Sequence, residues 1–76
     1  AGAHEGARGP SLMTPLGIIA GDVLLHLEAY GATTVRKLIQ ALEAPMSLVT
    51  MGVGALIREG LVSGSEHGTE VLVELS

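Results

Sequence analysis

The sequence contains no cysteine, phenylalanine or tryptophan, and Tyr30 is its single aromatic residue. Without cysteine the chain has no disulfide framework, no thiol nucleophile, and neither a cysteine zinc site nor an iron–sulfur cluster. Cations are also few, because four Lys and Arg stand against eight Asp and Glu, which gives a net charge of −4 with histidine neutral. This balance disfavours tight non-specific binding to nucleic acid, which requires clustered Lys and Arg.

Aliphatic side chains are abundant instead. Leu, Ile, Val and Met together account for 26 of the 76 residues, and a chain this short has room for one hydrophobic core only. No apolar run approaches the roughly 18 residues of a membrane-spanning helix. The first residues also lack a basic region followed by an apolar stretch, so no signal peptide is expected. We therefore expect one soluble, cytoplasmic domain without a membrane partner.

The first helix is predicted from a start signal, a stop signal and the period between them. Residues 1–12 show no apolar period and are predicted to form a flexible tail ahead of one domain at 13–76. Thr14-Pro15 is typical of a helix start and Gly31 of a helix end. Between them the spacing predicts a helix over 16–30, whose core face contains Leu16, Ile19, Ala20, Val23, Leu24, Leu27 and Tyr30. Gly17 and Gly21 weaken this helix by roughly 1 kcal/mol each, which suggests that a neighbouring element approaches its backbone.

Two further helices and two strands follow. Thr34 is predicted to cap a helix over 35–43 and Ser47 a helix over 48–59, with Pro45 between them and Gly60 as the final stop. After Gly60 the apolar period changes from 3.6 to 2, which predicts strands on both sides of a turn at 67–68. With a short extended piece near residue 33, this is the order of a winged helix-turn-helix. This α+β fold has three helices and a small antiparallel sheet with a C-terminal wing hairpin.

The first and third predicted helices carry a resemblance to a known family. The pattern comprises Gly17, Ala20-Gly21, Val23-Leu24, Leu27 and Gly31, followed by Val49, Met51, Gly54, Leu56, Arg58, Glu59 and Gly60. It resembles a family of small prokaryotic winged helix-turn-helix proteins of unknown function, over about residues 16–76. The sequence departs from the family at Leu24 and Ala55, where large aromatics are expected. The resemblance implies the fold and no particular activity.

No catalytic, cofactor or metal site is predicted. Asp22 and His26 lie four residues apart on the first helix, but two ligands without a third are typical of a surface pair rather than a metal site. No serine has a recognisable nucleophile elbow, and Gly52 and Gly54 lie within a helix rather than in a phosphate-binding loop. We expect a protein that is not an enzyme and takes no small molecule.

The third helix is the element that reads DNA in many winged helices, where its exposed face carries polar and basic residues. A projection at 100° per residue turns Val49, Val53, Leu56 and Ile57 inward, and Leu48, Met51, Gly52, Ala55, Arg58 and Glu59 outward. This outer face is mostly apolar or small. A DNA-binding transcription regulator that uses Arg36, Lys37 and Arg58, pooled from two subunits, is therefore the alternative hypothesis, disfavoured by the charge of −4.

A second apolar row favours a protein partner. Ile18, Leu25 and Ala29 fall opposite the core face of the first helix, which is unusual for a monomer unless the tail or further strands cover them. We expect a protein-interaction or dimerisation module whose partner is a second copy or another protein. The predicted interface uses these three residues, or Leu48, Met51 and Ala55, or both sets.

Overall fold

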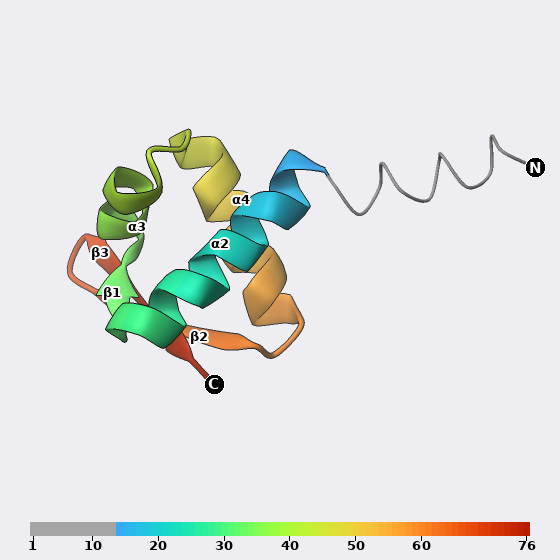
Figure 1. The fold of residues 1–76 in the computed structure, drawn as a ribbon. Helices are drawn as coiled ribbons and strands as arrows, with labels where there is room; N and C mark the ends of the chain where they lie inside the picture. Colours follow the sequence, from blue (N-terminus) through green and yellow to red (C-terminus); the bar gives the residue numbers. More distant parts are fainter. Residues whose placement is uncertain (1–13) are drawn as a thin grey trace, which may run out of the picture.

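The computed structural model describes residues 14–76, which form three helices and one three-stranded antiparallel sheet (Figure 1). The elements follow in the order α2 (Pro15–Tyr30), β1 (Thr33–Thr34), α3 (Val35–Leu42), α4 (Met46–Arg58), β2 (Val62–His67) and β3 (Glu70–Leu75). This is the α+β layout of a winged helix-turn-helix, with β2 and β3 as the wing hairpin. The predicted tail at 1–12 lies outside the described residues.

The predicted ends of α2 and the start of α3 are confirmed by their capping hydrogen bonds. The Thr14 hydroxyl accepts a hydrogen bond from the Gly17 amide at 3.2 Å, and the Thr34 hydroxyl accepts one from the Lys37 amide at 3.1 Å. Each bond satisfies one of the amides that a helix start leaves unpaired. Gly31 ends α2 with a φ of +85°, a backbone conformation that a side chain disfavours.

The prediction that Ser47 caps the third helix is wrong. Helix α4 begins at Met46, and its N-cap is Pro45, which makes no side-chain cap hydrogen bond. The Pro45 carbonyl instead accepts from the amides of Leu48 and Val49, both at 3.1 Å. The fixed φ of proline suits the residue at a helix boundary, so the helix begins there and places Ser47 in its first turn.

The sheet has the strand order β1-β3-β2, with both pairings antiparallel. His67 pairs with Glu70, so the wing turn consists of Gly68 and Thr69 alone. Gly68 has a φ of +65°, and positive φ at the first central residue only is the pattern of a type II′ hairpin turn. The predicted hairpin turn is therefore present but lies at 68–69 rather than 67–68, because His67 still pairs within the sheet. The tightness of the turn fixes the register of the wing.

The core lies between α2, α3, α4 and the inner face of the sheet, and it is entirely aliphatic. Its buried members are Ile19, Val23, Leu27, Leu38, Val49, Val53, Leu56, Val62 and Val73. The prediction that Tyr30 belongs to the core face is wrong, because 78% of its surface is exposed. As the last residue of α2, Tyr30 lies beyond the packed part of the helix, and its ring contacts the His26 ring at a centroid distance of 4.8 Å.

Helices α2 and α4 pack directly on each other, and a glycine permits their close approach (Figure 1). That glycine is Gly52, which is buried. A Cβ atom at position 52 would lie 3.1 Å from Ile19 Cγ2 and 3.7 Å from the Ala20 backbone nitrogen. The projection that turned Gly52 outward is therefore wrong. The close approach expected at Gly21 is not made within the described chain either, since a Cβ there would meet nothing within 4 Å.

Gly52→Ala and Gly54→Ala are expected to change the free energy of unfolding in different ways. Both replace a glycine in the interior of α4, which by itself stabilises the helix by about 1 kcal/mol. At position 54 a Cβ meets nothing within 4 Å, whereas at position 52 it crowds the stiff, β-branched Ile19. Urea denaturation should therefore show Gly52→Ala to be less stable than Gly54→Ala by about 1–2 kcal/mol. Equal gains for both variants would contradict the close contact.

Candidate protein-interaction surfaces

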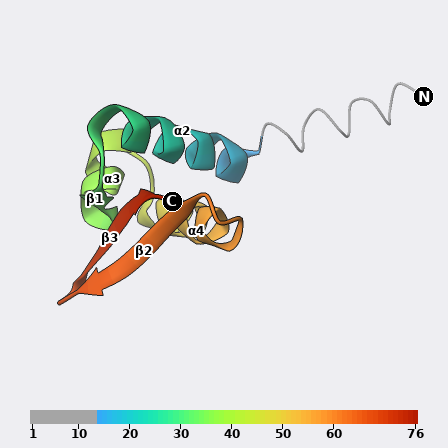
Figure 2. The same cartoon turned by 90° about the horizontal axis from the view of Figure 1, so that it is seen from below.

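The outer side of α2 carries an exposed apolar row. Ile18 and Leu25 expose 47% and 64% of their surface, and Ala29 is also exposed. Gly21 lies between the two large side chains, with open space where its Cβ would be. Figure 2 shows α2 as an outer layer, with α4 and the sheet on its other side. The projection that placed this row opposite the core is confirmed, and no other element of residues 14–76 covers it.

The predicted apolar set on α4 does not form a comparable surface. Met51 exposes 58% of its surface, but Leu48 and Ala55 are half-buried, and Leu48 packs against the hydrophobic core. All three lie on the flank of α4 next to Gly52, where α2 approaches. The contact between the two helices therefore leaves Met51 as the one well-exposed member of this set.

An apolar groove opens on the opposite flank of α4. It has a volume of about 550 Å³ and lies between α4, the start of α3 and the tip of the wing. Most of its lining is aliphatic, with Thr50, Thr69, Arg36 and Glu70 as polar members; the apolar side chains are Val35, Ile39, Met46, Val53, Ile57 and Val71. The sequence predicted that Val53 and Ile57 point inward, and only the packing of α3, α4 and β3 brings the lining residues together.

Ile57 shows why periodicity missed the groove. It was predicted to point inward, but it exposes 42% of its surface and lines the groove. Its Cδ1 atom lies 3.1 Å from the place where a Cβ of Gly64 would be, so the side chain rests on the wing strand β2. Ile57 therefore packs on the hairpin rather than in the core, and the absence of a side chain at Gly64 leaves space for it.

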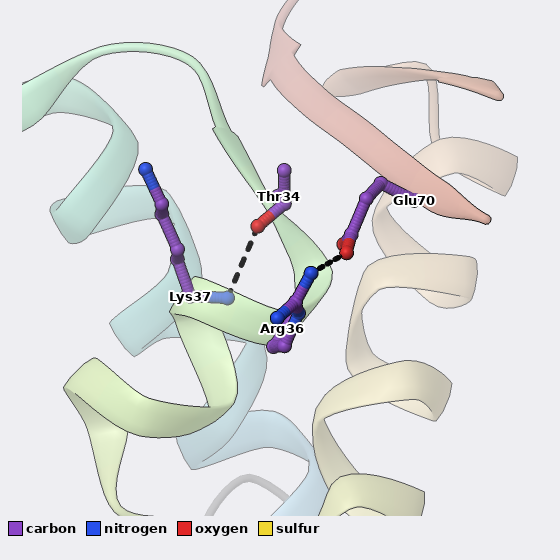
Figure 3. Close-up of polar contacts among 4 residues, drawn as sticks. All are labelled: Thr34, Arg36, Lys37 and Glu70. Atoms are coloured by element: carbon purple, nitrogen blue, oxygen red, sulfur yellow. Dashed lines mark hydrogen bonds and ion pairs between the residues drawn. The ribbon is translucent and has the colours of Figure 1, made fainter. Parts of the chain in front are cut away.

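Two of the three residues of the DNA hypothesis are adjacent but point in different directions. Arg36 forms an ion pair with Glu70 of the wing, whereas the Lys37 side chain extends away from that pair (Figure 3). The Lys37 amide donates to Thr34, the cap of α3. Arg58 lies in the last turn of α4. The described structure thus pairs one of the three cations, Arg36, with an acid, and the side chain of its neighbour Lys37 extends away from that pair.

His26 does not meet Asp22. Within the described residues, no hydrogen bond or ion pair joins the two, and the imidazole ring packs against Tyr30 at an interplanar angle of 43°. Residues 14–76 also contain no group of three or more His, Asp or Glu side chains arranged to hold a metal ion. Asp22 and His26 are therefore two half-buried side chains of α2 that do not form a metal site with a third ligand within these residues.

A serine–histidine contact that the sequence did not indicate occurs on the wing. The Ser65 hydroxyl and His67 Nε2 lie 3.0 Å apart, and Glu70 is the register partner of His67. Serine, histidine and a carboxylate resemble a hydrolytic triad, but the Glu70 carboxylate is directed to Arg36. Ser65 and His67 are exposed on the strand, and neither of them lines the apolar groove. Catalysis by such a group needs a sequestered site with oxyanion donors, so the contact is a surface hydrogen bond.

Comparisons with known proteins do not assign the chain to a family. No protein-family model matches it, and no curated protein matches it either. The resemblance to the prokaryotic winged-helix family therefore stays a prediction. No helix within residues 14–76 is long and apolar enough to cross a membrane.

Duplex DNA added at low salt is expected to leave the amide chemical shifts of Arg36, Lys37 and Arg58 unchanged. Phosphate contact requires several free cations on one face, and here one of three is paired with Glu70. The measurement is a titration of ¹⁵N-labelled protein, with the Glu70→Gln variant, which frees the Arg36 guanidinium, as the comparison. Shift changes at these three residues that vanish at higher salt would instead support the DNA-binding hypothesis.

Proposed function

We propose that this domain is a non-catalytic protein-interaction module that pairs with a second copy of itself through α2. The observation that carries the proposal is the exposed row of Ile18, Leu25 and Ala29, with the open Gly21 among them. Exposed aliphatic side chains gathered on one helix face are uncommon in proteins that stay monomeric. Gly21 lies within α2 and lowers the stability of this helix. The close approach of a second helix at this position is a physical reason for a glycine there.

The shape of this face is complementary to itself. Ile18, Gly21, Asp22 and Leu25 have the spacing i, i+3, i+4 and i+7 that outlines one hole on a helix surface. In an antiparallel pair related by a two-fold axis, Leu25 of each copy enters the hole of the other beside Gly21. Ile18 then lies against Ala29 of the second copy, a large side chain against a small one. Such a reciprocal arrangement is what a closed, isologous dimer requires.

The polar side chains on the same face can also pair in this arrangement. Asp22 and His26 lie on one flank of the row, and antiparallel pairing brings the same flank of each helix together. Asp22 of one copy is then opposite His26 of the other, twice in each dimer. Since no ion pair joins Asp22 to His26 within the described chain, the carboxylate can serve the partner. The flank on the other side carries Glu28 opposite Gly17, so no acids of the two copies face each other there.

The proposed dimer is weak. One pair of helix faces falls at the low end of specific interfaces, below about 1,200 Å² of total buried surface. We expect a dissociation constant on the order of 0.1–1 mM, corresponding to about 4–5.5 kcal/mol. Oligomerisation of this strength would still add to the stability of a domain with a small aliphatic core.

Leu25→Asp is expected to abolish self-association without unfolding the domain, because Leu25 is exposed in the monomer and would bring a carboxylate into the apolar centre of the dimer. Concentration-dependent amide shifts on α2, together with light scattering, measure the effect in the unaltered protein and in the variant. Met51→Asp is the matched control on the other helix and should leave association unchanged.

A second pair of variants tests the arrangement itself. His26→Asp should weaken the dimer at least tenfold, and the exchange Asp22→His with His26→Asp should restore it. Protein that stays monomeric at millimolar concentration, or a loss of association with Met51→Asp rather than Leu25→Asp, would contradict pairing through α2.

The alternative function is a DNA-binding transcription regulator. It is supported by the helix-turn-helix formed by α3 and α4, which in other proteins presents its second helix to the major groove. Arg36, Lys37 and Arg58 would supply the contacts. The groove on the flank of α4 is mostly apolar, and the wing strands carry Glu66, Glu70 and Glu74 but no Lys or Arg. Both features provide little for phosphates or base edges to bind, so we favour the protein partner.

A further inference from the structure

The groove between α3, α4 and the wing lies on a different face from the apolar row of α2. We propose that it binds an amphipathic helix of another protein, with aliphatic anchors on one face and Lys or Arg beside them. This inference goes beyond self-association and does not depend on it. A dimer joined through α2 would present two such grooves.

The dimensions of the groove suit a short helix. Along α4 its lining extends from Met46 to Ile57, which at 1.5 Å per residue is about 16 Å, or three helical turns. Recognition of a helix in a groove uses anchors at i, i+3 or i+4, and i+7, which span two turns. Gly54 in the middle of this length presents no side chain, and a Cβ there would meet nothing. The floor is therefore open where the central anchor would enter.

The chemistry of the lining selects apolar anchors. The long aliphatic side chains of Met46 and Ile57 are exposed, with Val35, Ile39 and Val71 around them. Water in contact with this surface is released when an aliphatic side chain covers it, which is the main source of affinity in such grooves. Apart from the Arg36–Glu70 ion pair, the polar side chains of the lining are those of Thr50 and Thr69, each of which also carries a methyl group.

The charge around the groove selects basic flanks on the partner. Arg36 is the one cation among the lining residues, and Glu70 neutralises it. Glu66 is the register partner of Val71, so its carboxylate shares the sheet face that forms the wing wall of the groove. Residues 14–76 keep three cations and seven acids, which leaves the full net charge of −4 on the folded part. Complementary charge would speed the association of a basic segment with the groove and fix how that segment is oriented in it.

The same charge argues against a second copy of this chain in the groove. Another copy carries the same excess of acids, and its exposed helix α2 has Asp22 and Glu28 next to its apolar row. A contact between the groove of one copy and α2 of the next would also be heterologous and would continue into open chains. A basic helix of another protein avoids both the repulsion between acidic residues and the growth of open chains.

Three synthetic helical peptides test the proposal. The first carries Leu at i, i+3/i+4 and i+7 with Lys on the flanks; the second has Glu in place of Lys; the third has Ala in place of Leu. Titration into ¹⁵N-labelled protein should show the Leu/Lys peptide shifting the amides of Val35, Ile39, Thr50, Gly54, Ile57 and Val71. The Leu/Glu peptide should bind at least tenfold more weakly, and the Ala/Lys peptide should produce no saturable shifts at these amides.

Variants separate the groove from general attraction between a basic peptide and an acidic protein. Met46→Asp should lower the affinity for the Leu/Lys peptide at least tenfold, and Glu66→Lys should lower it while raising the affinity for the Leu/Glu peptide. Met51→Asp, which adds the same charge outside the groove, should leave it unchanged. The Leu25→Asp variant, which is altered outside the groove, should bind the peptide with the same affinity as the unaltered protein. Loss of self-association and loss of peptide binding can therefore be told apart. Equal binding of all three peptides, shifts confined to α2, no binding, or an unaffected Met46→Asp would each overturn the proposal.

Discussion

The close contact between α2 and α4 at Gly52 is the constraint on which the rest of the molecule depends. Without a side chain at this position, Ile19 and the backbone of Ala20 can lie directly against α4. The aliphatic side chains on either side then close into one core without an aromatic residue to fill a wider gap. Because α2 contacts α4 through the side that carries Ile19 and Ala20, the opposite side of α2, with Ile18 and Leu25, is exposed.

The same contact decides what α4 can present to other molecules. One flank of the helix is taken up by α2, so Leu48 and Ala55 are half-buried. The other flank faces α3 and the wing, where Ile57 rests above Gly64 and an apolar groove remains. A helix in this position reads DNA when its free side is polar and basic. Here the groove side of α4 is lined mostly by apolar side chains, and the one guanidinium in that lining, Arg36, is paired with Glu70 of the wing.

Much of the fold could be predicted from local signals. Thr14, Pro15, Gly31 and Thr34 set the limits of α2 and the start of α3 through hydrogen bonds within a few residues. The change in the spacing of apolar residues after Gly60, from a helical period to alternation, predicted the two wing strands. The start of α4 could not be placed in the same way, because Pro45 and Ser47 both fit a helix boundary, and the carbonyl of Pro45 accepted the free amides without any side-chain cap.

The exposed row on α2 followed from periodicity alone, since its three members lie on one helix and their spacing is local. What the sequence by itself determined was therefore the order of elements, most of their ends, the acidic charge and this row. Tertiary structure alone decided that Gly52 rather than Gly21 meets a neighbour, that Tyr30 is exposed, and that Ile57, Ile39 and Val71 meet in one groove. The physical reason is that periodicity describes which side of one element is apolar. Which elements cover that side depends on contacts between residues far apart in the chain.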